Sequence, residues 1–133
     1  AIANQVRQVI GVEVIPGAVA AAQINLRANN INNADYILAD APKQFAKWQS
    51  ERLRPNVVFV DPPRRGLTRE LIQATTEMGP DKFVYISCNP VTLVRDAVEI
   101  IRNGYHIDGP IVPVDQFPQT SHIESITIFK KNS

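Results

Sequence analysis

The sequence is poor in cysteine and has no long apolar run. Its single cysteine cannot form an intrachain disulfide, and no pair of cysteine or histidine residues has the spacing of a zinc site. We therefore expect no metal and a reducing, cytoplasmic compartment. The apolar stretches stay well short of the roughly 20 residues that cross a bilayer, so no membrane partner is expected. The first residues, with Asn4 and Gln5 among them, do not resemble a secretory signal.

The sequence also lacks an excess of positive or negative charge. The 133 residues include 14 Lys+Arg and 13 Asp+Glu, which gives a net charge of +1. The overall balance therefore provides no electrostatic reason to expect a nucleic-acid partner, and any RNA contact must be local. With 44% hydrophobic and 20% charged residues, the composition is typical of a soluble globular protein with one core, so residues 1–133 are expected to form a single domain.

Short β-rich runs alternate with longer helical stretches along the chain, which predicts a parallel sheet wrapped by helices. The expected strands are residues 8–14, 36–39, 57–60, 82–87, 107–114 and 123–130. The expected helices are residues 18–29, 43–53, 67–77 and 91–103, three of which have a proline near the start. The last two strands have no helix between them, so we expect them to pair antiparallel.

Four polar or reactive residues follow the expected strands, where open α/β sheets bind their ligands. They are Glu13, Asp40, Asp61 and Cys88. A carboxylate such as Glu13 at a strand end can accept hydrogen bonds from both hydroxyls of a ribose. Taken alone, Glu13 and Asp40 fit a solvated strand end equally well.

The segment Asp61-Pro62-Pro63-Arg64-Arg65-Gly66 is more specific. Two prolines remove two backbone donors and hold φ near one value, so they predict a rigid turn directly after a buried strand. Such a turn can hold a carboxylate and carbonyls against a flat ligand, and Arg64 and Arg65 add two permanent cations. The alternative is a stiff loop with no ligand.

Cys88 is the only thiol, and it lies between a β-run and the helix that begins near Pro90. The N-terminal dipole of that helix favours the thiolate form. The alternative is an inert, buried cysteine. Further on, alternation places His122 and Glu124 on one face of the last expected strand, although a polar face of an edge strand would look the same.

Taken in order, four segments resemble the RNA uracil-5-methyltransferase family, whose members modify ribosomal or transfer RNA. The resemblance extends over residues 9–130 and is carried by Gly11-Val12-Glu13, Asp61-Pro62-Pro63-Arg64-Arg65-Gly66, Ser87-Cys88-Asn89-Pro90 and His122-Ile123-Glu124. It implies a Rossmann-like class I S-adenosylmethionine-dependent methyltransferase sheet with a C-terminal antiparallel hairpin. It also implies S-adenosylmethionine as cofactor and RNA as substrate.

The resemblance implies roles for individual residues. Cys88 would attack carbon 6 of uracil, and Glu124 would remove the proton from carbon 5. Carbon 5 is a poor nucleophile until a thiolate adds to carbon 6, so these residue types suit the reaction. The implied cofactor contacts are Glu13, Asp40 and Asp61. The implied substrate contacts are Arg64, Arg65, Asn89 and His122.

The sequence departs from the family pattern at its start. Relatives have an aspartate-led strand and a glycine-rich loop before the segment that matches the first residue, whereas the six glycines here include no Gly-x-Gly. That strand would be the central one of the sheet, so the expected strands 8–14 and 57–60 lack their shared neighbour. We therefore interpret the chain as a truncated catalytic domain, inactive by itself and able to oligomerise through exposed sheet edges.

Two other functions remain open. One is a nucleic-acid amino-methyltransferase, which also uses an acidic residue followed by two prolines. In that class an aromatic residue follows the prolines, whereas this chain has Arg64 at that position. The other is a non-catalytic fragment that binds RNA or a partner protein. These residues do not identify the modified uridine or the RNA that carries it, and they contain no N-terminal RNA-binding module or iron–sulfur cluster ligands.

Overall fold

A computed structural model describes residues 2–116 and 118–133. The chain divides into two compact units, one up to Gln44 and one from Phe45 onwards, and we describe each separately. The hydrogen-bonded strands form two sheets that correspond to these units. No described helix is both long and apolar enough to cross a membrane.

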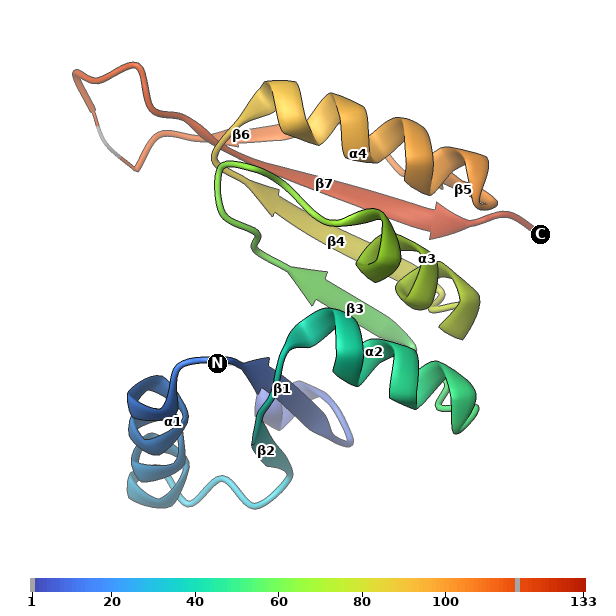
Figure 1. Cartoon of the computed structure of the whole chain (residues 1–133). Helices are drawn as coiled ribbons and strands as arrows, with labels where there is room; N and C mark the ends of the chain where they lie inside the picture. Colours follow the sequence, from blue (N-terminus) through green and yellow to red (C-terminus); the bar gives the residue numbers. More distant parts are fainter. Residues whose placement is uncertain (1, 117) are drawn as a thin grey trace. The chain divides into compact units, whose positions relative to one another are not determined.

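The N-terminal unit is a parallel strand pair with one helix beside it. After a 3-10 turn at Ala3–Gln5, β1 (Val9–Glu13) pairs in parallel with β2 (Ala34–Leu38). The helix α1 (Pro16–Ala28) connects them and lies alongside, in blue in Figure 1. Its first residue is a proline, which loses no hydrogen bond there because the first turn has no intrahelical acceptor. The expected start at residue 18 was therefore two residues late.

The helix α2 (Ala41–Ser50) follows β2 and crosses the boundary between the units. Its one aromatic pair, Phe45 and Trp48, has ring centroids 5.4 Å apart. The helix begins directly after Asp40, whose Oδ2 accepts a hydrogen bond from the backbone N–H of Lys43 at 3.4 Å. Asp40 therefore caps α2, as a carboxylate at this position commonly does.

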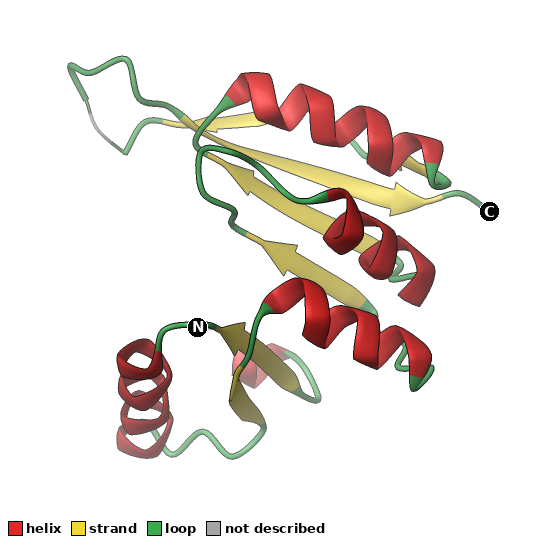
Figure 2. Cartoon of the chain, in the orientation of Figure 1, coloured by secondary structure: helices red, strands yellow, loops and turns green. Residues whose placement is uncertain are grey.

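The C-terminal unit is a mixed sheet in the order β3-β4-β7-β5, and β6 also pairs with β7. The arrows of β3 and β4 run the same way in Figure 2 and that of β7 runs opposite to them. The elements of this unit are β3 (Val57–Val60), α3 (Arg69–Met78), β4 (Lys82–Ser87), α4 (Pro90–Arg102), β5 (Tyr105–Ile107), β6 (Val112–Val114) and β7 (Glu124–Lys131). The expected antiparallel pairing at the C-terminal end is confirmed.

The helices α3 and α4 cover one face of this sheet (Figure 1), and the core lies between these helices and the sheet. The buried apolar side chains there include Val58, Val60, Ile72, Met78, Phe83, Tyr85, Leu93, Ile100, Tyr105 and Phe129. Residues one step along each strand point to the other face. On that face Val57 is 42% exposed and Phe59 is 55% exposed.

Two expectations about the C-terminal strands were wrong. The expected strand at residues 107–114 is interrupted: β5 ends at Ile107 and β6 begins at Val112, because Gly109 has a φ of +84° and Pro110 has no N–H to donate to a ladder. Asp108 still donates its N–H to the carbonyl of Ile128 at 2.8 Å before the chain leaves the sheet. The last strand begins at Glu124, so His122 lies in the preceding loop and does not share a strand face with Glu124.

Candidate active site

Cys88 lies at the junction of β4 and α4, between Ser87, the last residue of the strand, and Asn89, the N-cap of the helix. The Oγ of Ser87 accepts the N–H of Asn89 at 3.0 Å and donates to its carbonyl at 2.9 Å. The side-chain oxygen of Asn89 accepts the N–H of Val91 at 3.1 Å. These bonds hold the half-buried thiol of Cys88 in a defined turn.

The pairing of β4 with β7 brings together the two chain segments that carry Cys88 and Glu124. The last residue pair in the antiparallel register is Ser87 with Ser125, and Cys88 and Glu124 are the chain neighbours of these two residues. Both side chains are half-buried. The two residues therefore lie at the same end of the β4–β7 pair.

The loop after β3 carries Asp61, Arg64 and Arg65, all exposed. A turn closes it, because the N–H of Gly66 donates to the carbonyl of Pro63 at 2.8 Å. The side chain of Asn89 donates to the carbonyl of Arg64 at 2.9 Å. The two arginines thus extend from a turn that is bonded to the residue next to the candidate nucleophile.

Glu13 and Asp40 belong to the N-terminal unit, at the carboxyl ends of β1 and β2. These strands are neighbours, and the N–H of Ala39 donates to the carbonyl of Glu13 at 3.0 Å. One carboxylate oxygen of Glu13 accepts the N–H groups of Val14 at 2.7 Å and Ile15 at 2.9 Å. The two acidic residues therefore lie at one edge of one sheet, whereas Asp61 belongs to the other unit.

His122 is exposed, and its backbone N–H donates to the Oγ1 of Thr120 at 3.2 Å. Asn89 uses both ends of its amide within the protein. The predicted substrate contacts of both residues stay predictions. Among residues 2–116 and 118–133, no group of three or more His, Cys, Asp or Glu side chains could hold a metal ion.

Sequence reasoning missed Asp96, which is only 2% exposed. The signal was present, because Leu93, Ala97 and Ile100 make the buried stripe of α4 and Asp96 falls within it at helical spacing. A carboxylate in such a stripe requires partners, since an unpaired buried charge is very costly.

Comparison with known proteins decides the family. The family model described as tRNA (Uracil-5-)-methyltransferase matches residues 1–132. The chain belongs to that family. A protein of Lactiplantibacillus plantarum named as an uncharacterized RNA methyltransferase is 50% identical over 97% of this chain and 28% of its own length. A Lactococcus lactis protein of similar name is 46% identical over 97% of this chain and 28% of its own length.

Solved structures agree with the family and the fold. The tRNA (uracil-54, C5)-methyltransferase of Pyrococcus abyssi, in complex with S-adenosyl-L-homocysteine, has a TM-score of 0.77 and 31% identity over 96% of this chain and 30% of its own. An rRNA methylase of Streptococcus thermophilus shares the fold alone, with a TM-score of 0.74 and 11% identity over 99% of this chain and 78% of its own. The expected Rossmann-like class I methyltransferase fold is confirmed. The chain spans less than a third of the two curated relatives.

Proposed function

We propose that these residues serve S-adenosylmethionine-dependent methylation of carbon 5 of a uridine in transfer or ribosomal RNA, with Cys88 as nucleophile. The observation that supports the proposal is the pairing of Ser87 with Ser125, whose neighbours Cys88 and Glu124 lie at the same end of the β4–β7 pair, in a chain of the uracil-5-methyltransferase family. A thiol and a carboxylate at one sheet edge are the two groups that the reaction requires.

In the proposed reaction the thiolate of Cys88 adds to carbon 6 of uracil, and the ring becomes an enolate with nucleophilic character at carbon 5. S-adenosylmethionine supplies the methyl group that carbon 5 takes up. The carboxylate of Glu124 then accepts the proton from carbon 5, and the electrons of that C–H bond form the C5–C6 double bond as the sulfur of Cys88 departs. The cysteine is regenerated.

The acidic residues of the N-terminal unit fit the cofactor chemically. Glu13 ends β1 and has a carboxylate oxygen beyond the one that binds Val14 and Ile15, so it can accept from ribose hydroxyls. Asp40, at the end of the neighbouring strand, and Asp61, after β3, are the other two proposed contacts. Arg64, Arg65 and His122 are exposed donors suited to an RNA backbone.

Replacing Glu124 by glutamine tests the mechanism. Glutamine keeps the shape but cannot accept the carbon 5 proton, so a methylated RNA adduct on Cys88 is expected to accumulate. The protein at its full natural length is mixed with substrate RNA and S-adenosylmethionine and then analysed by denaturing electrophoresis and mass spectrometry. The control is Glu70→Gln, an exposed carboxylate of the first turn of α3, which should give no adduct. Normal turnover by Glu124→Gln without an adduct would contradict the proposed base.

Residues 1–133 by themselves are expected to bind S-adenosylmethionine weakly or not at all. The chain has no Gly-x-Gly loop whose backbone amides could approach the ligand, and its strands pair as two separate sheets. Calorimetric titration measures the affinity, and the protein at its full natural length is the positive control. Micromolar affinity of residues 1–133 would show that the cofactor site needs nothing else.

A further inference from the structure

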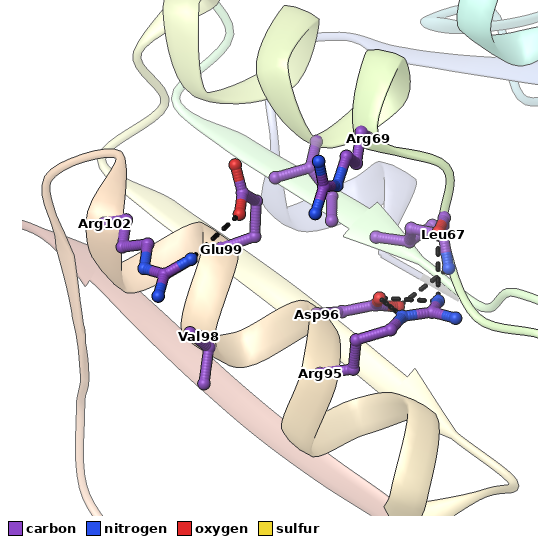
Figure 3. A pocket seen from close by; sticks show the side chains of 8 residues that line it. Leu67, Arg69, Arg95, Asp96, Val98, Glu99 and Arg102 are labelled. Atoms are coloured by element: carbon purple, nitrogen blue, oxygen red, sulfur yellow. Dashed lines mark hydrogen bonds and ion pairs between the residues drawn. The ribbon is translucent and has the colours of Figure 1, made fainter.

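The buried carboxylate of Asp96 on α4 binds three residues: one in β4, one in the loop before α3, and its neighbour on α4. Its Oδ2 accepts the hydroxyl of Tyr85 in β4 at 2.7 Å and the backbone N–H of Leu67, in the loop before α3, at 2.7 Å. Its Oδ1 accepts two donors from the guanidinium of Arg95, at 2.8 and 2.7 Å. Figure 3 shows Arg95, Asp96 and Leu67 converging at one end of a cavity of about 410 Å³ between α3 and α4.

The same face of α4 binds the backbone of the turn that carries the two arginines. Arg95 Nη2 donates to the carbonyl of Arg65 at 2.8 Å and to that of Leu67 at 3.2 Å. The hydroxyl of Thr92 donates to the carbonyl of Arg64 at 3.1 Å, and the amide of Asn89 donates to that carbonyl as well. Successive carbonyls of the turn are therefore tied to the helix that begins after Cys88.

We propose that Asp96 is a positioning residue, which holds Arg64 and Arg65 at a set place relative to Cys88 so that the RNA backbone and the uracil ring are aligned together. The inference rests on the proposed function. It goes further by assigning a role to Asp96, Arg95 and Thr92, which touch neither the substrate nor the reacting atoms.

The geometry suits a rigid coupling. Charge-assisted hydrogen bonds to a buried carboxylate are short and strong, and a buried charge that loses a partner destabilises its surroundings. Tyr85 connects the carboxylate to β4, the strand that leads to Cys88. Burial raises the pKa of Tyr85 well above its usual range, and the bond to Asp96 raises it further, so the phenol stays a donor to the carboxylate. The carboxylate of Asp96 thus connects β4, the turn that carries the arginines, and α4.

A double-mutant cycle tests this role on the protein at its full natural length. Asp96→Asn is expected to lower kcat/KM for the RNA about tenfold, since small misplacements of reacting groups have effects of this size or larger. The affinity for S-adenosylmethionine should change less than about twofold, because Asp61 directly follows β3 and the prolines after it restrict the backbone there. In the background Arg64→Ala/Arg65→Ala, adding Asp96→Asn should have less than about a twofold further effect.

The matched control is Glu99→Gln, the same chemical change three residues along α4, where the ion pair with Arg102 is 3.8 Å long. It should leave kcat/KM unchanged. If Asp96→Asn does not fold, Thr92→Val replaces it in the same double-mutant cycle. This change removes the hydrogen bond from the hydroxyl of Thr92 to the same turn. Additive losses in the cycle, or an equal loss in Glu99→Gln, would overturn the positioning role. Cys88→Ala, measured in parallel, tests the proposed function separately: retained uridine methylation in this variant would contradict the nucleophile whatever the outcome of the cycle.

Discussion

Replacing Cys88 by alanine is expected to reduce methylation of RNA by about 10⁴-fold or more, because loss of a covalent nucleophile removes the step that activates carbon 5. Transfer of a labelled methyl group from S-adenosylmethionine to substrate RNA measures the effect on the protein at its full natural length. Cys88→Ser keeps the size and the turn but is a far weaker nucleophile at neutral pH, so it should not restore the rate.

Binding measurements separate loss of chemistry from loss of structure. Cys88 is half-buried, and the turn around it is held by Ser87 and Asn89 rather than by the thiol. The affinity of Cys88→Ala for RNA and for cofactor should therefore stay close to that of the unmodified protein. Undiminished methylation by the variant, with the methyl group on an exocyclic amine, would favour the amino-methyltransferase alternative that uses Asp61-Pro62-Pro63.

Gly66→Ala is expected to lower the free energy of unfolding by about 3 kcal/mol. Gly66 has a φ of +77°, and a left-handed conformation costs an L-residue roughly 1–2 kcal/mol. An added Cβ would also lie 2.5 Å from Asp96 Oδ2 and 2.6 Å from Arg95 Nη2, so the network must open. Disturbing hydrogen bonds to a buried charge adds about 1–3 kcal/mol. Urea denaturation followed by circular dichroism measures the change.

Gly104→Ala is the matched control for Gly66→Ala. Gly104 also has a positive φ, +92°, but nothing lies within 4 Å of the position its Cβ would take. Only the backbone strain remains, so the expected loss is about 1–2 kcal/mol. Equal losses in the two variants would show that the crowding around Asp96 contributes nothing to stability.

Local sequence patterns were sufficient for much of the fold. The strands at residues 57–60 and 82–87 were predicted with the bounds that the structure has, since each is a short β-rich run between turn-forming residues. All four long helices were predicted to within a few residues, and the differences at Pro16 and Pro90 arise because proline is accepted as the first helical residue. These features depend on neighbours in the chain.

Long-range strand pairing was harder to predict from the sequence. Both β5 and β6 pair with β7, on either side of Gly109 and Pro110, and the start of β7 at Glu124 coincides with the last pair that it makes with β6. Alternation alone placed His122 on the same face as Glu124, whereas the strand begins only at Glu124. Strand ends of this kind are determined by the partner strand, which a local pattern does not contain.

The sequence by itself determined the α/β class, the antiparallel C-terminal pairing, the candidate nucleophile and base, and the family that the motifs indicate. Only the tertiary structure decided that Ser87 pairs with Ser125, so that Cys88 and Glu124 lie at the same end of the β4–β7 pair, and that Asp96 ties the arginine-bearing turn to α4. The physical reason is the range of the interactions. Propensity, capping and proline geometry act within a few residues, whereas register and a buried carboxylate's partners join segments far apart in the chain and depend on the whole packing.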